Sequence, residues 1–555
     1  MTHIDAEIRS QVLSEGLIRA IFLLLGVGSL IPWNAFVSAK PYFQSRLCLD
    51  GHDIIDLELW FGFVWNLSSV ISLGLIIMVQ IIRDQMDENE HERTTMTISN
   101  SNQNDAAIAA ATEPLNPNGE MCNGYKEGHS FWLVTMPLAV YLAIFMFMDI
   151  LVFIPDIPPV TFMILTLLGL AICGICGSIA TAGIVSTAGL FPSNIGINPF
   201  FSGQAVGGVA VSGANFFAAI MENPSSFWEQ RCEGDGELLF GLKASPTPCA
   251  PYQKLDWIVS IYFFSGCVVL ASCLVGYSYV DRYKQSEHRD DYEPVHDVTT
   301  VIDSSPRIGL ELHDRIRERG EQEDELESDL DEDQLQSPHS CSPENDGGPS
   351  ESNTPSDPIL GSDLHTEGGD ATTAVWTAVK GPASCIFLTF TVTLALFPGW
   401  ISRLRSSHEC RSRFRLFNDL YTPFSFLIFN AGDLCGRILS EKVPVGRIRN
   451  MSLKLVVAAV LRVVFFPLFF LCVAGGERQD SVWTIQSDLY SFTIQLLFAF
   501  TNGILLSCSF MHAPCLISNT TSMQERSSEI LTFAVSFGLL NGSLLSFPFS
   551  NIAAH

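Results

Sequence analysis

Two opposite charges lie four residues apart inside an apolar stretch of this chain. Asp433 and Arg437 belong to segment 424–439, Phe-Ser-Phe-Leu-Ile-Phe-Asn-Ala-Gly-Asp-Leu-Cys-Gly-Arg-Ile-Leu. Because residues i and i+4 share one face of a helix, the two side chains can reach each other. A charge at membrane depth costs about 3 kcal/mol or more, so such residues usually pair, line a wet cavity and mark a solute path. The alternative is a structural ion pair that fixes one helix against another.

A third charge lies in a different apolar stretch. Arg462 belongs to Leu461-Arg462-Val463-Val464-Phe465-Phe466-Pro467. Its guanidinium needs a carboxylate or several carbonyl oxygens, and Asp433 is one candidate partner. We therefore expect Arg462 to have a structural or coupling role.

Two uncharged motifs lie nearer the N-terminus. Pro32 precedes Trp33, and a proline inside a span frees backbone carbonyls that protein or water must cover. Trp33 can offer a flat face to a ring-shaped solute, or it can belong to the aromatic belt at the membrane surface. Gly203 and Gly207 have the Gly-x-x-x-Gly spacing that lets helices approach closely. Gln204 between them can bond a solute or a neighbouring backbone, and we favour the structural role.

The elements that must position these residues are membrane-spanning helices. The chain has 555 residues, 47% of them hydrophobic, and a formal net charge of −28. Apolar stretches long enough to cross about 30 Å of hydrocarbon recur along it. We therefore predict an all-α polytopic membrane protein with about eleven transmembrane helices. They span residues 17–37, 60–82, 131–153, 160–182, 197–221, 256–280, 376–398, 416–439, 452–474, 488–510 and 530–550.

The negative charge is concentrated between the sixth and seventh predicted helices. Residues 281–374 contain an acidic run at 321–334 and a tract rich in Ser, Pro and Gly, a composition that predicts a disordered loop. Ser-Pro pairs at Ser305, Ser337 and Ser342 are candidate kinase sites in this loop. The predicted organisation is a cytosolic tail at 1–16, a six-helix bundle at 17–280 with a disordered loop at 83–129, the acidic cytosolic loop at 281–374, and a five-helix bundle at 375–555.

Positive charges give conflicting indications of orientation. Lys442, Arg447, Arg449 and Lys454 flank the loop 441–451, which favours a cytosolic position for it. A second group of arginines lies between the seventh and eighth helices, on the opposite side if eleven helices span. We place the first loop, the N-terminus and the acidic loop inside, and the C-terminus outside.

Most of the fifteen cysteines lie in apolar spans, where a thiol acts as a small hydrophobe. Cys173 and Cys176 have redox spacing but lie within one predicted helix, so close packing is the favoured interpretation. Cys232 and Cys249 share the predicted outer loop between the fifth and sixth helices, and we consider them a candidate disulfide.

Several catalytic motifs are absent from the sequence. It contains no Gly-x-x-x-x-Gly-Lys-Ser/Thr loop, no His-Glu-x-x-His and no Gly-x-Ser-x-Gly elbow. His512 lies near the inner end of the tenth predicted helix, and the other histidines fall outside the spans. We predict no enzymatic activity, no metal site, no cofactor and no nucleic-acid partner.

Taken together, these residues resemble the equilibrative nucleoside transporter family. The similarity covers nearly all predicted spans but neither long polar loop, and the order and spacing of its motifs within a six-plus-five layout are specific. The motifs are Pro32-Trp33-Asn34, Ser202-Gly203-Gln204, Thr393-Leu394-Ala395-Leu396-Phe397-Pro398, Phe429-Asn430 followed by Asp433-x-x-Gly436-Arg437, and Arg462 through Pro467.

The resemblance implies an eleven-helix fold of the major facilitator type, with a central cavity that carries nucleosides or nucleobases down their gradient. Asp433 and Arg437 would then contact the sugar and base. A carboxylate can accept bonds from both ribose hydroxyls, and a guanidinium can donate to ring or ribose oxygens. The family pattern also places Leu30, Trp33, Val37 and Leu539 by the cavity, and it makes Asn430, Phe426 and Pro398 outer-gate candidates.

The sequence departs from the family pattern in two helices. The family commonly has a glutamine in helix four, after a glycine that matches Gly177, and Thr181 takes that place here. One hydroxyl offers less than an amide donor and acceptor, so base preference can differ, or Gln204 or Arg437 can supply the contact. Trp65 replaces a frequent flexible hydrophobe in helix two and would narrow the cavity.

The favoured hypothesis is a facilitative carrier whose partners are the nucleoside and the lipid bilayer. A proton-coupled carrier that uses Asp433 is the nearest alternative. A membrane sensor that signals through the acidic loop is a more distant one, and an intramembrane enzyme is another. The N-terminal tail has no acidic dileucine signal, which favours the plasma membrane over the endolysosome.

Overall fold

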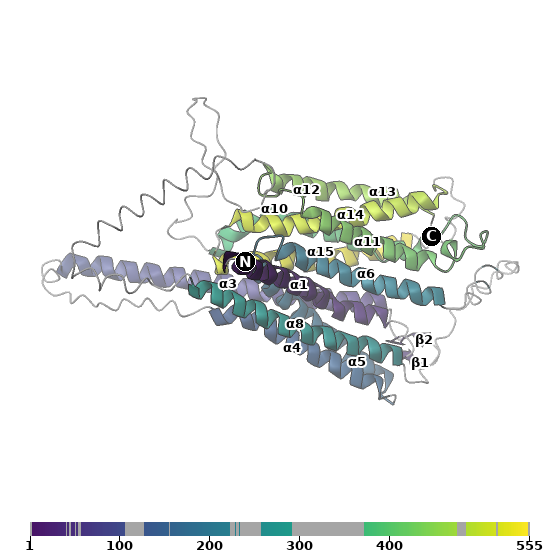
Figure 1. The fold of residues 1–555 in the computed structure, drawn as a ribbon, viewed down its shortest axis with the longest axis horizontal. Coiled ribbons are helices and arrows are strands. Elements are labelled where there is room, and N and C mark those ends of the chain that lie inside the picture. The colour runs from purple at the N-terminus through teal and green to yellow at the C-terminus, as the bar shows by residue number, and fades with distance from the viewer. Residues whose placement is uncertain are drawn as a thin grey trace, which may run out of the picture. The chain divides into compact units, whose positions relative to one another are not determined.

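Long helices that run side by side make up nearly all of the structure (Figure 1). This computed structural model describes residues 3–39, 42–43, 46–49, 52–53, 57–105, 127–154, 156–221, 228, 232, 257–290, 371–473, 484–517 and 520–552. Two short strands, β1 (Cys48–Leu49) and β2 (His52–Asp53), pair antiparallel between the first two helices. Residues 1–277 and 343–555 form one compact unit, and Ser278–Ser342 form another, of which the described part is the end of helix α8.

Six long helices precede the acidic segment, and we call them the N-terminal half. Helix α1 begins at His3, in the predicted N-terminal tail and well before its predicted span 17–37, and α3 and α8 continue into predicted loops. The other three helices begin and end within six residues of the predicted spans. The predicted span 197–221 coincides with α6. The helices are α1 (His3–Ser38), α3 (Leu57–Asp105), α4 (Glu127–Val152), α5 (Pro159–Ala188), α6 (Ile197–Met221) and α8 (Trp257–Asp290).

The helices after the acidic segment form the C-terminal half. The predicted helix 452–474 is divided, because a 3₁₀ turn, η5 (Arg462–Val464), separates α12 (Met451–Leu461) from α13 (Phe465–Phe470). Pro467 explains the division, since its ring clashes with the carbonyl four residues earlier and it has no N–H to donate. The remaining helices are α10 (Ala371–Leu396), α11 (Tyr421–Ser440), α14 (Asp488–His512) and α15 (Thr521–Ile552), with short turns η3 (Ile401–Arg403), η4 (Arg415–Phe417) and η7 (Ala513–Leu516).

Ten helical segments in the described part of the chain are long and apolar enough to cross a bilayer. The protein is therefore an all-α polytopic membrane protein. Helix α11 falls outside this group because its charged and amide side chains lower its mean hydropathy. The count of eleven spans in a six-plus-five arrangement stays a prediction. The ten segments are Ser14–Phe36, Trp60–Met86, Phe131–Val152, Pro159–Ala188, Ile197–Met221, Val259–Tyr283, Thr372–Arg403, Met451–Phe470, Asp488–Leu516 and Ser522–Ser546.

The start of the predicted loop 83–129 is wrong, because α3 continues to Asp105. Residues 83–105 contain no Gly or Pro, and Glu, Gln, Met and Arg favour helix in their first half. The backbone therefore has no stop signal where the apolar stretch ends. The rest of this loop, 106–126, lies outside the described residues, as do most of the acidic loop and the C-terminal three residues.

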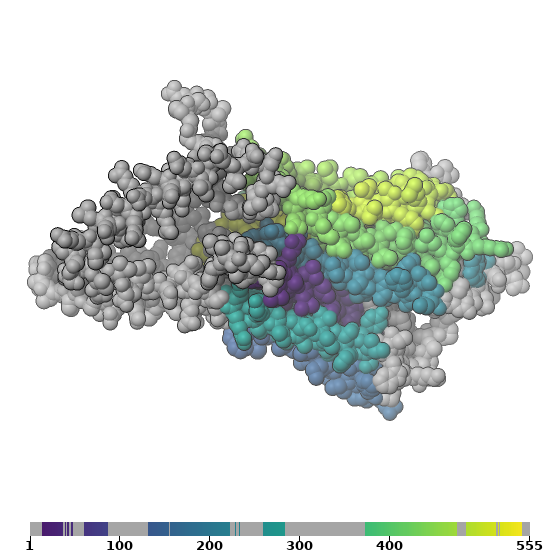
Figure 2. All heavy atoms as spheres, viewed as in Figure 1, coloured from purple at the N-terminus to yellow at the C-terminus, as the bar shows by residue number. Residues whose placement is uncertain are grey.

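Small residues bring helices together within and between the halves. In the N-terminal half α1 packs along α6, and in the C-terminal half α10 packs along α15 and α11 along α14. A Cβ on Gly26 or on Gly203 would lie 2.0 Å from a carbonyl oxygen of the opposite helix, so only glycine permits the α1–α6 contact. Between the halves, α6 packs on α11, and α15 packs on α3 and α5. Figure 2 shows α6 (blue) and α11 (green) meeting on one face of the molecule.

Candidate functional site

The ion pair on α11 is formed and buried. Arg437 donates through Nε to Oδ2 of Asp433 over 2.8 Å, and each residue is only 6% exposed. This geometry confirms the prediction that the i,i+4 spacing lets the two side chains pair. Because a buried charge is stabilised only by close partners, the remaining polar atoms of the pair also need bonds.

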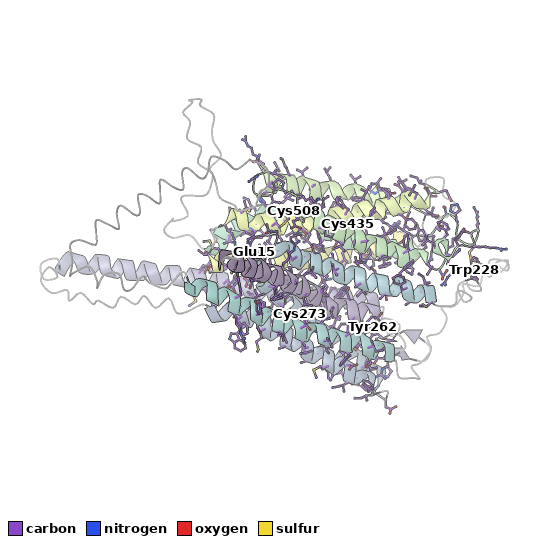
Figure 3. The ribbon with its side chains drawn as sticks, in the orientation of Figure 1. Glu15, Trp228, Tyr262, Cys273, Cys435 and Cys508 are labelled. Carbon is purple, nitrogen blue, oxygen red and sulfur yellow. A yellow bond between two sulfur atoms is a disulfide. The ribbon has the colours of Figure 1, made fainter. Side chains whose placement is uncertain are left out.

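The second oxygen of Asp433 is bonded to the neighbouring helix α14. Asn502 donates its amide to Oδ1 of Asp433 over 2.7 Å. Two glycines let the helices approach closely enough for this short bond. A Cβ on Gly436 would lie 2.2 Å from the backbone carbonyl oxygen of Phe500, and a Cβ on Gly503 would lie 2.1 Å from the backbone carbonyl oxygen of Asp433. The two helices therefore touch backbone to backbone. In Figure 3 they are the neighbours that carry the labelled Cys435 and Cys508.

The guanidinium of Arg437 reaches across to the N-terminal half. It donates through Nη1 to the carbonyl oxygen of Phe201 over 2.8 Å and to Oε1 of Gln204 over 3.2 Å. Gln204 in turn donates to the hydroxyl of Ser29 on α1 over 3.2 Å. One side chain thus holds Asp433 on its own helix and α6 on the other half.

Arg462 is connected to the pair through two intervening side chains. It donates to the hydroxyl of Thr393 over 2.8 Å, and Thr393 donates to Oδ1 of Asn502 over 2.7 Å. It also donates to the Phe498 carbonyl over 2.9 Å and to the hydroxyl of Thr501. Its guanidinium carbon lies 4.6 Å from the Phe498 ring centroid, a cation–π contact. Carbonyl and hydroxyl oxygens accept from both of its Nη groups, whereas its buried Nε has no hydrogen-bond partner among the described residues, and Asp433 is its indirect partner.

These bonds form one continuous set, which we call the polar network. It crosses the bundle from α1 to η5, and each member is at most 9% exposed. It offers a solute a carboxylate, amides, hydroxyls and two guanidinium groups in a dry surrounding, where each bond is stronger than in water. Its members are Ser29, Gln204, Arg437, Asp433, Asn502, Thr393 and Arg462.

An aromatic cluster lies in the N-terminal half. The Trp33 and Trp65 rings are 5.6 Å apart between centroids in an edge-to-face arrangement, and Trp65 lies 6.5 Å from Tyr141. A Cβ on Gly177 would lie 1.9 Å from the Tyr141 hydroxyl oxygen, so this position requires glycine. Trp33 is half-buried, which leaves part of its ring available.

The gate candidates of the C-terminal half lie around a stack of phenylalanines. Phe397 stacks on Phe429 with centroids 3.8 Å apart, and its centroid lies 5.1 Å from that of Phe426. Pro398 follows, joined by a cis peptide bond, and is exposed. Asn430 donates to the Phe426 carbonyl of its own helix over 2.9 Å.

The other predicted cavity residues are placed without a specific contact to the pair. Leu30, Thr181 and Leu539 are half-buried on α1, α5 and α15. Val37 lies in α1, and its side chain is outside what the structure describes. Within the described residues, no three His, Cys, Asp or Glu side chains group closely enough to hold a metal ion.

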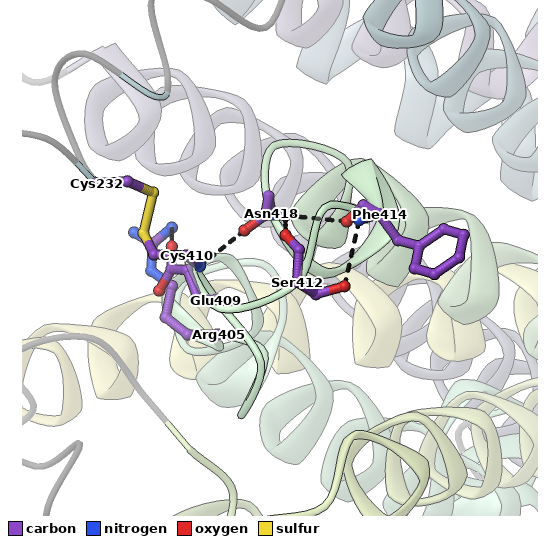
Figure 4. The surroundings of a disulfide bond; sticks show 7 residues. All are labelled: Cys232, Arg405, Glu409, Cys410, Ser412, Phe414 and Asn418. Atoms are coloured by element: carbon purple, nitrogen blue, oxygen red, sulfur yellow. Dashed lines mark hydrogen bonds and ion pairs between the residues drawn. A yellow bond between two sulfur atoms is a disulfide. The ribbon is translucent and has the colours of Figure 1, made fainter.

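The predicted disulfide between Cys232 and Cys249 is wrong in its second partner. Cys232 is bonded to Cys410 in the loop between α10 and α11, with Cα atoms 5.5 Å apart (Figure 4). Cys410 has φ 61°, and its N–H donates to Oδ1 of Asn418 over 2.8 Å, which holds this loop in a tight turn. The sequence prediction paired neighbours within one loop, whereas the fold brings two loops together. Cys249 lies outside the described residues.

Sequence reasoning missed three members of the polar network as site residues. Ser29, Thr393 and Asn502 are uncharged, and short polar side chains are common in spans because they can bond their own helix. Of the three, Asn502 was the most predictable as a site residue, because an amide inside an apolar span needs hydrogen-bond partners on another helix.

The chain matches known transporters along most of its length. The family model described as nucleoside transporter matches residues 247–551. The mouse (Mus musculus) equilibrative nucleoside transporter 2 is 24% identical over 97% of both chains, and the rat (Rattus norvegicus) equilibrative nucleoside transporter 1 is 25% identical over 95% of both. The nucleoside transporter FUN26 of the yeast Saccharomyces cerevisiae is 33% identical over 30% of this chain and 31% of its own. With its helical membrane fold and this extended similarity, the chain belongs to the nucleoside transporter family.

Proposed function

We propose that this protein carries nucleosides across a membrane, down their concentration gradient, by alternating access. The family membership and the ten apolar helices support a multi-pass carrier. The observation that carries the assignment of the site is the buried Asp433–Arg437 pair, which lies where the two halves meet. The similar proteins are named equilibrative, and this name favours downhill transport here.

Asp433 is the ribose ligand in this proposal. Its two carboxylate oxygens already accept from Asn502 and Arg437 and can accept from vicinal hydroxyls in the same way. A nucleoside therefore replaces the Asn502 amide with a ribose hydroxyl and leaves the bond to Arg437 in place. The exchange keeps the carboxylate satisfied at every stage, so binding does not strand a buried charge.

Arg437 couples substrate binding to movement of the halves. Its bonds to Phe201 and Gln204 are the contacts of the pair that cross from α11 to α6. When a base or ribose oxygen takes the place of these acceptors, the link across the halves loosens while the guanidinium stays bonded. Alternating access then follows from rocking of the halves around the site.

In this proposal the substrate cavity is lined by residues that the family pattern assigns to it. The Trp33 ring stacks against the base, with Leu30 and Leu539 as apolar walls, and Trp65 limits the width beside it. Thr181 and Gln204 offer polar contacts to the base edge. Gating is assigned to Val37, Pro398, Phe426 and Asn430, a set in which Phe426 rests on the Phe397 stack.

The experiment compares Asp433→Asn and Asp433→Ala with Asp488→Asn. Asp488 is a matched control because it is also a buried carboxylate, 9% exposed, but it accepts from Ser406 and Ser407 at the other end of α14. Uptake of labelled uridine and adenosine is divided by the amount of protein at the cell surface. We expect both Asp433 variants to lose uptake and Asp488→Asn to keep it. Normal uptake by Asp433→Ala at normal surface level would contradict the assigned role.

The membrane in which the protein works is the plasma membrane in this proposal. Its support is the N-terminal tail, which lacks an acidic dileucine signal. Surface biotinylation of the full-length chain in its native cells tests it. Recovery of the protein in lysosomal membranes, with none at the surface, would contradict the assignment.

A further inference from the structure

An aromatic contact joins the two halves directly beside the Asp433–Arg437 pair. The carbonyl of Phe201 accepts from Arg437, and the ring of the same residue contacts Phe510 on α14, with centroids 4.3 Å apart. Phe201 is 2% exposed and Phe510 is 1% exposed. Because Phe201 lies on α6, this contact packs one half against the other at the level next to the pair.

The Phe201–Phe510 contact lies toward the end of the bundle that we predict to be cytosolic. On α14, the ring at 510 follows Asn502, which bonds the pair, by about two turns. The helix ends at His512, whose ring lies 3.1 Å from the hydroxyl of Ser452 at the start of α12. Loop 441–451 directly precedes α12, and its charge pattern predicts a cytosolic position. On that prediction, the contact lies between the pair and the cytosol.

A small cleft lies against Phe510, and we call it the inner cleft. Its volume is about 10 Å³, close to the space that one water molecule needs. Both halves line it. Val185 and Ile197 come from the N-terminal half, and Phe510, Gln524, Ser527 and Ser528 come from the C-terminal half.

One polar group of the inner cleft is buried without a partner. Gln524 is 3% exposed, and its Nε2 has no hydrogen-bond partner among the described residues. Buried donors are normally bonded, so an unpartnered amide on the wall of a cleft indicates a place for a polar ligand. Ser528 differs, because its hydroxyl donates to the carbonyl of Ala182 on α5 over 2.8 Å and so holds α15 against the N-terminal half.

The side chains of the inner cleft can bind the parts of a nucleoside. An amide offers a donor and an acceptor to the edge of a base, and the hydroxyls of Ser527 and Ser528 can bond a ribose. The Phe510 ring offers a flat face to a base. In this conformation the inner cleft is too small for a nucleoside, so a solute can enter it only after the halves separate there.

We propose that the inner cleft is the exit of the nucleoside path, that the Phe201–Phe510 contact closes it, and that the Gln524 amide bonds the nucleoside as it leaves. Movement of the halves parts the two rings. Arg437 connects this step to the substrate, because one of its acceptors is the carbonyl of Phe201. The identity of the solute rests on the proposed function, whereas the closing role of the two rings does not.

Accessibility of a cysteine in the inner cleft tests the closing contact. The full-length variant Ser527→Cys is treated in sealed membrane vesicles with a membrane-impermeant maleimide, and mass spectrometry separates this label from labels on native cysteines. Ser527 is 2% exposed, so we expect slow labelling without substrate. Uridine should raise the rate about fivefold in vesicles that expose the cytosolic face, because transport parts the halves there. Phe510→Leu should raise the rate similarly without uridine, because the smaller side chain loses its ring contact with Phe201.

Two control variants separate opening of the inner cleft from general loosening. Phe537→Leu removes a ring contact with Phe387, 5.3 Å between centroids, but both rings belong to the C-terminal half. It should leave the labelling of Ser527→Cys unchanged. Ser509 is the neighbour of Phe510 in sequence, is 0% exposed and bonds Cys385 within the same half. Ser509→Cys should therefore stay unlabelled with and without Phe510→Leu.

The kinetics of efflux test the role of Gln524. Gln524→Leu keeps a similar volume but removes the amide. The uridine concentration that half-saturates efflux should rise about fivefold, as loss of one neutral hydrogen bond predicts, while the value for uptake stays within about twofold. Gln495→Leu is the matched control, because Gln495 is also buried, at 0% exposed, but bonds Ser491 toward the other end of α14. It should change neither value.

Three results would overturn the proposal. They are labelling of Ser527→Cys that neither uridine nor Phe510→Leu increases, labelling from the outer face alone, and equal labelling of Ser509→Cys after Phe510→Leu. An equal rise of both half-saturating concentrations in Gln524→Leu removes the role of Gln524. If uridine neither enters the vesicles nor changes the labelling while Phe510→Leu still increases it, the proposed function fails and the closing contact stands. Normal uridine transport with constant labelling has the opposite meaning.

Discussion

The two contact regions between the halves each contain an arginine–carboxylate pair, but the pairs are built differently. Asp433 and Arg437 lie on the same helix, so their bond survives any rigid movement of one half against the other. Asp84 and Arg526 lie on α3 and α15, so their bond must break when those helices separate. An ion pair that persists during the movement is suited to bind the substrate. An ion pair that breaks during the movement is suited to stabilise one conformation.

The surroundings of the two pairs follow the same division. Asp433 and Arg437 are each 6% exposed, and the pair has direct partners on α14 and α6, which hold its geometry before a solute arrives. Asp84, Thr372 and Arg526, which we call the Asp84 cluster, lie in the middle of α3 and near the starts of α10 and α15. The side chains of Asp84 and Arg526 are 12% and 16% exposed, against 9% and 7% for Asp433 and Arg437, so water screens the Asp84–Arg526 pair more. Rigid geometry and easy opening are thus assigned to different regions.

The largest effect is expected from Arg437→Lys. An ammonium group keeps the charge but cannot bond Asp433, the Phe201 carbonyl and Gln204 together. Each buried group that is left without its hydrogen bond costs about 1–3 kcal/mol, so the loss of two such bonds should lower uptake per surface molecule by about two orders of magnitude. Labelled uridine uptake, corrected for surface protein, gives the measurement.

Arg415→Lys is the matched control for that change. Arg415 also pairs with an aspartate four residues away, Asp419, and donates to the carbonyls of Ile220 and Ala219 at the end of α6. Its side chain is 28% exposed, so water can replace the lost bonds. Uptake should stay within about threefold of the unmodified protein. Equal losses from both substitutions would mean that Arg437 serves only to fix α11 against α6.

A smaller effect is expected from Asn502→Ala. Removal of the amide leaves one oxygen of Asp433 without a donor, at a cost of about 1–3 kcal/mol. A ribose hydroxyl can supply the missing donor, so substrate binding compensates part of the loss. We expect reduced protein stability with uptake reduced about tenfold or less, and a thermal shift on adding uridine larger than that of the unmodified protein. An unchanged shift would mean that the nucleoside does not take the position of this amide.

Local sequence pattern predicted the pair but not its partners. The i,i+4 spacing of Asp433 and Arg437 is decided within one helix turn, and the structure has them bonded. Asn502 is 69 residues from Asp433 in sequence, and Gln204 is 233 residues from Arg437. Only the packing of the helices brings these side chains into contact with the pair. The glycines at the helix contacts can be read from the sequence. The sequence pattern around a glycine does not predict which helix packs against it.

The Asp84 cluster is a second case in which the sequence pattern did not predict a contact. The apolar stretch ends at about residue 82, so Asp84 was assigned to a loop, whereas the helical backbone continues to Asp105. Hydropathy marks where the hydrocarbon ends and contains no information on where the backbone hydrogen bonds end. The partner of Cys232 was missed for a related reason, because Cys410 is distant in sequence and only the fold brings the two loops together.

The smallest effect is expected from exchanging the charges of the Asp84 cluster. Asp84→Arg alone places like charges together, and Asp84→Arg with Arg526→Asp restores an ion pair across the halves. The single variant should change the uptake rate severalfold, because one conformation loses a contact, while the affinity for uridine, set at Asp433, stays within about twofold. The double variant should recover most of the uptake rate.

The same exchange at Arg405 and Glu409, a pair within one loop of the C-terminal half, should change neither the uptake rate nor the affinity for uridine. If the change in uptake rate of the double variant equals the sum of the changes of the two single variants, the Asp84–Arg526 ion pair does not govern the movement of the halves. The proposed difference between a persistent pair and a breakable pair would then be wrong for Asp84 and Arg526.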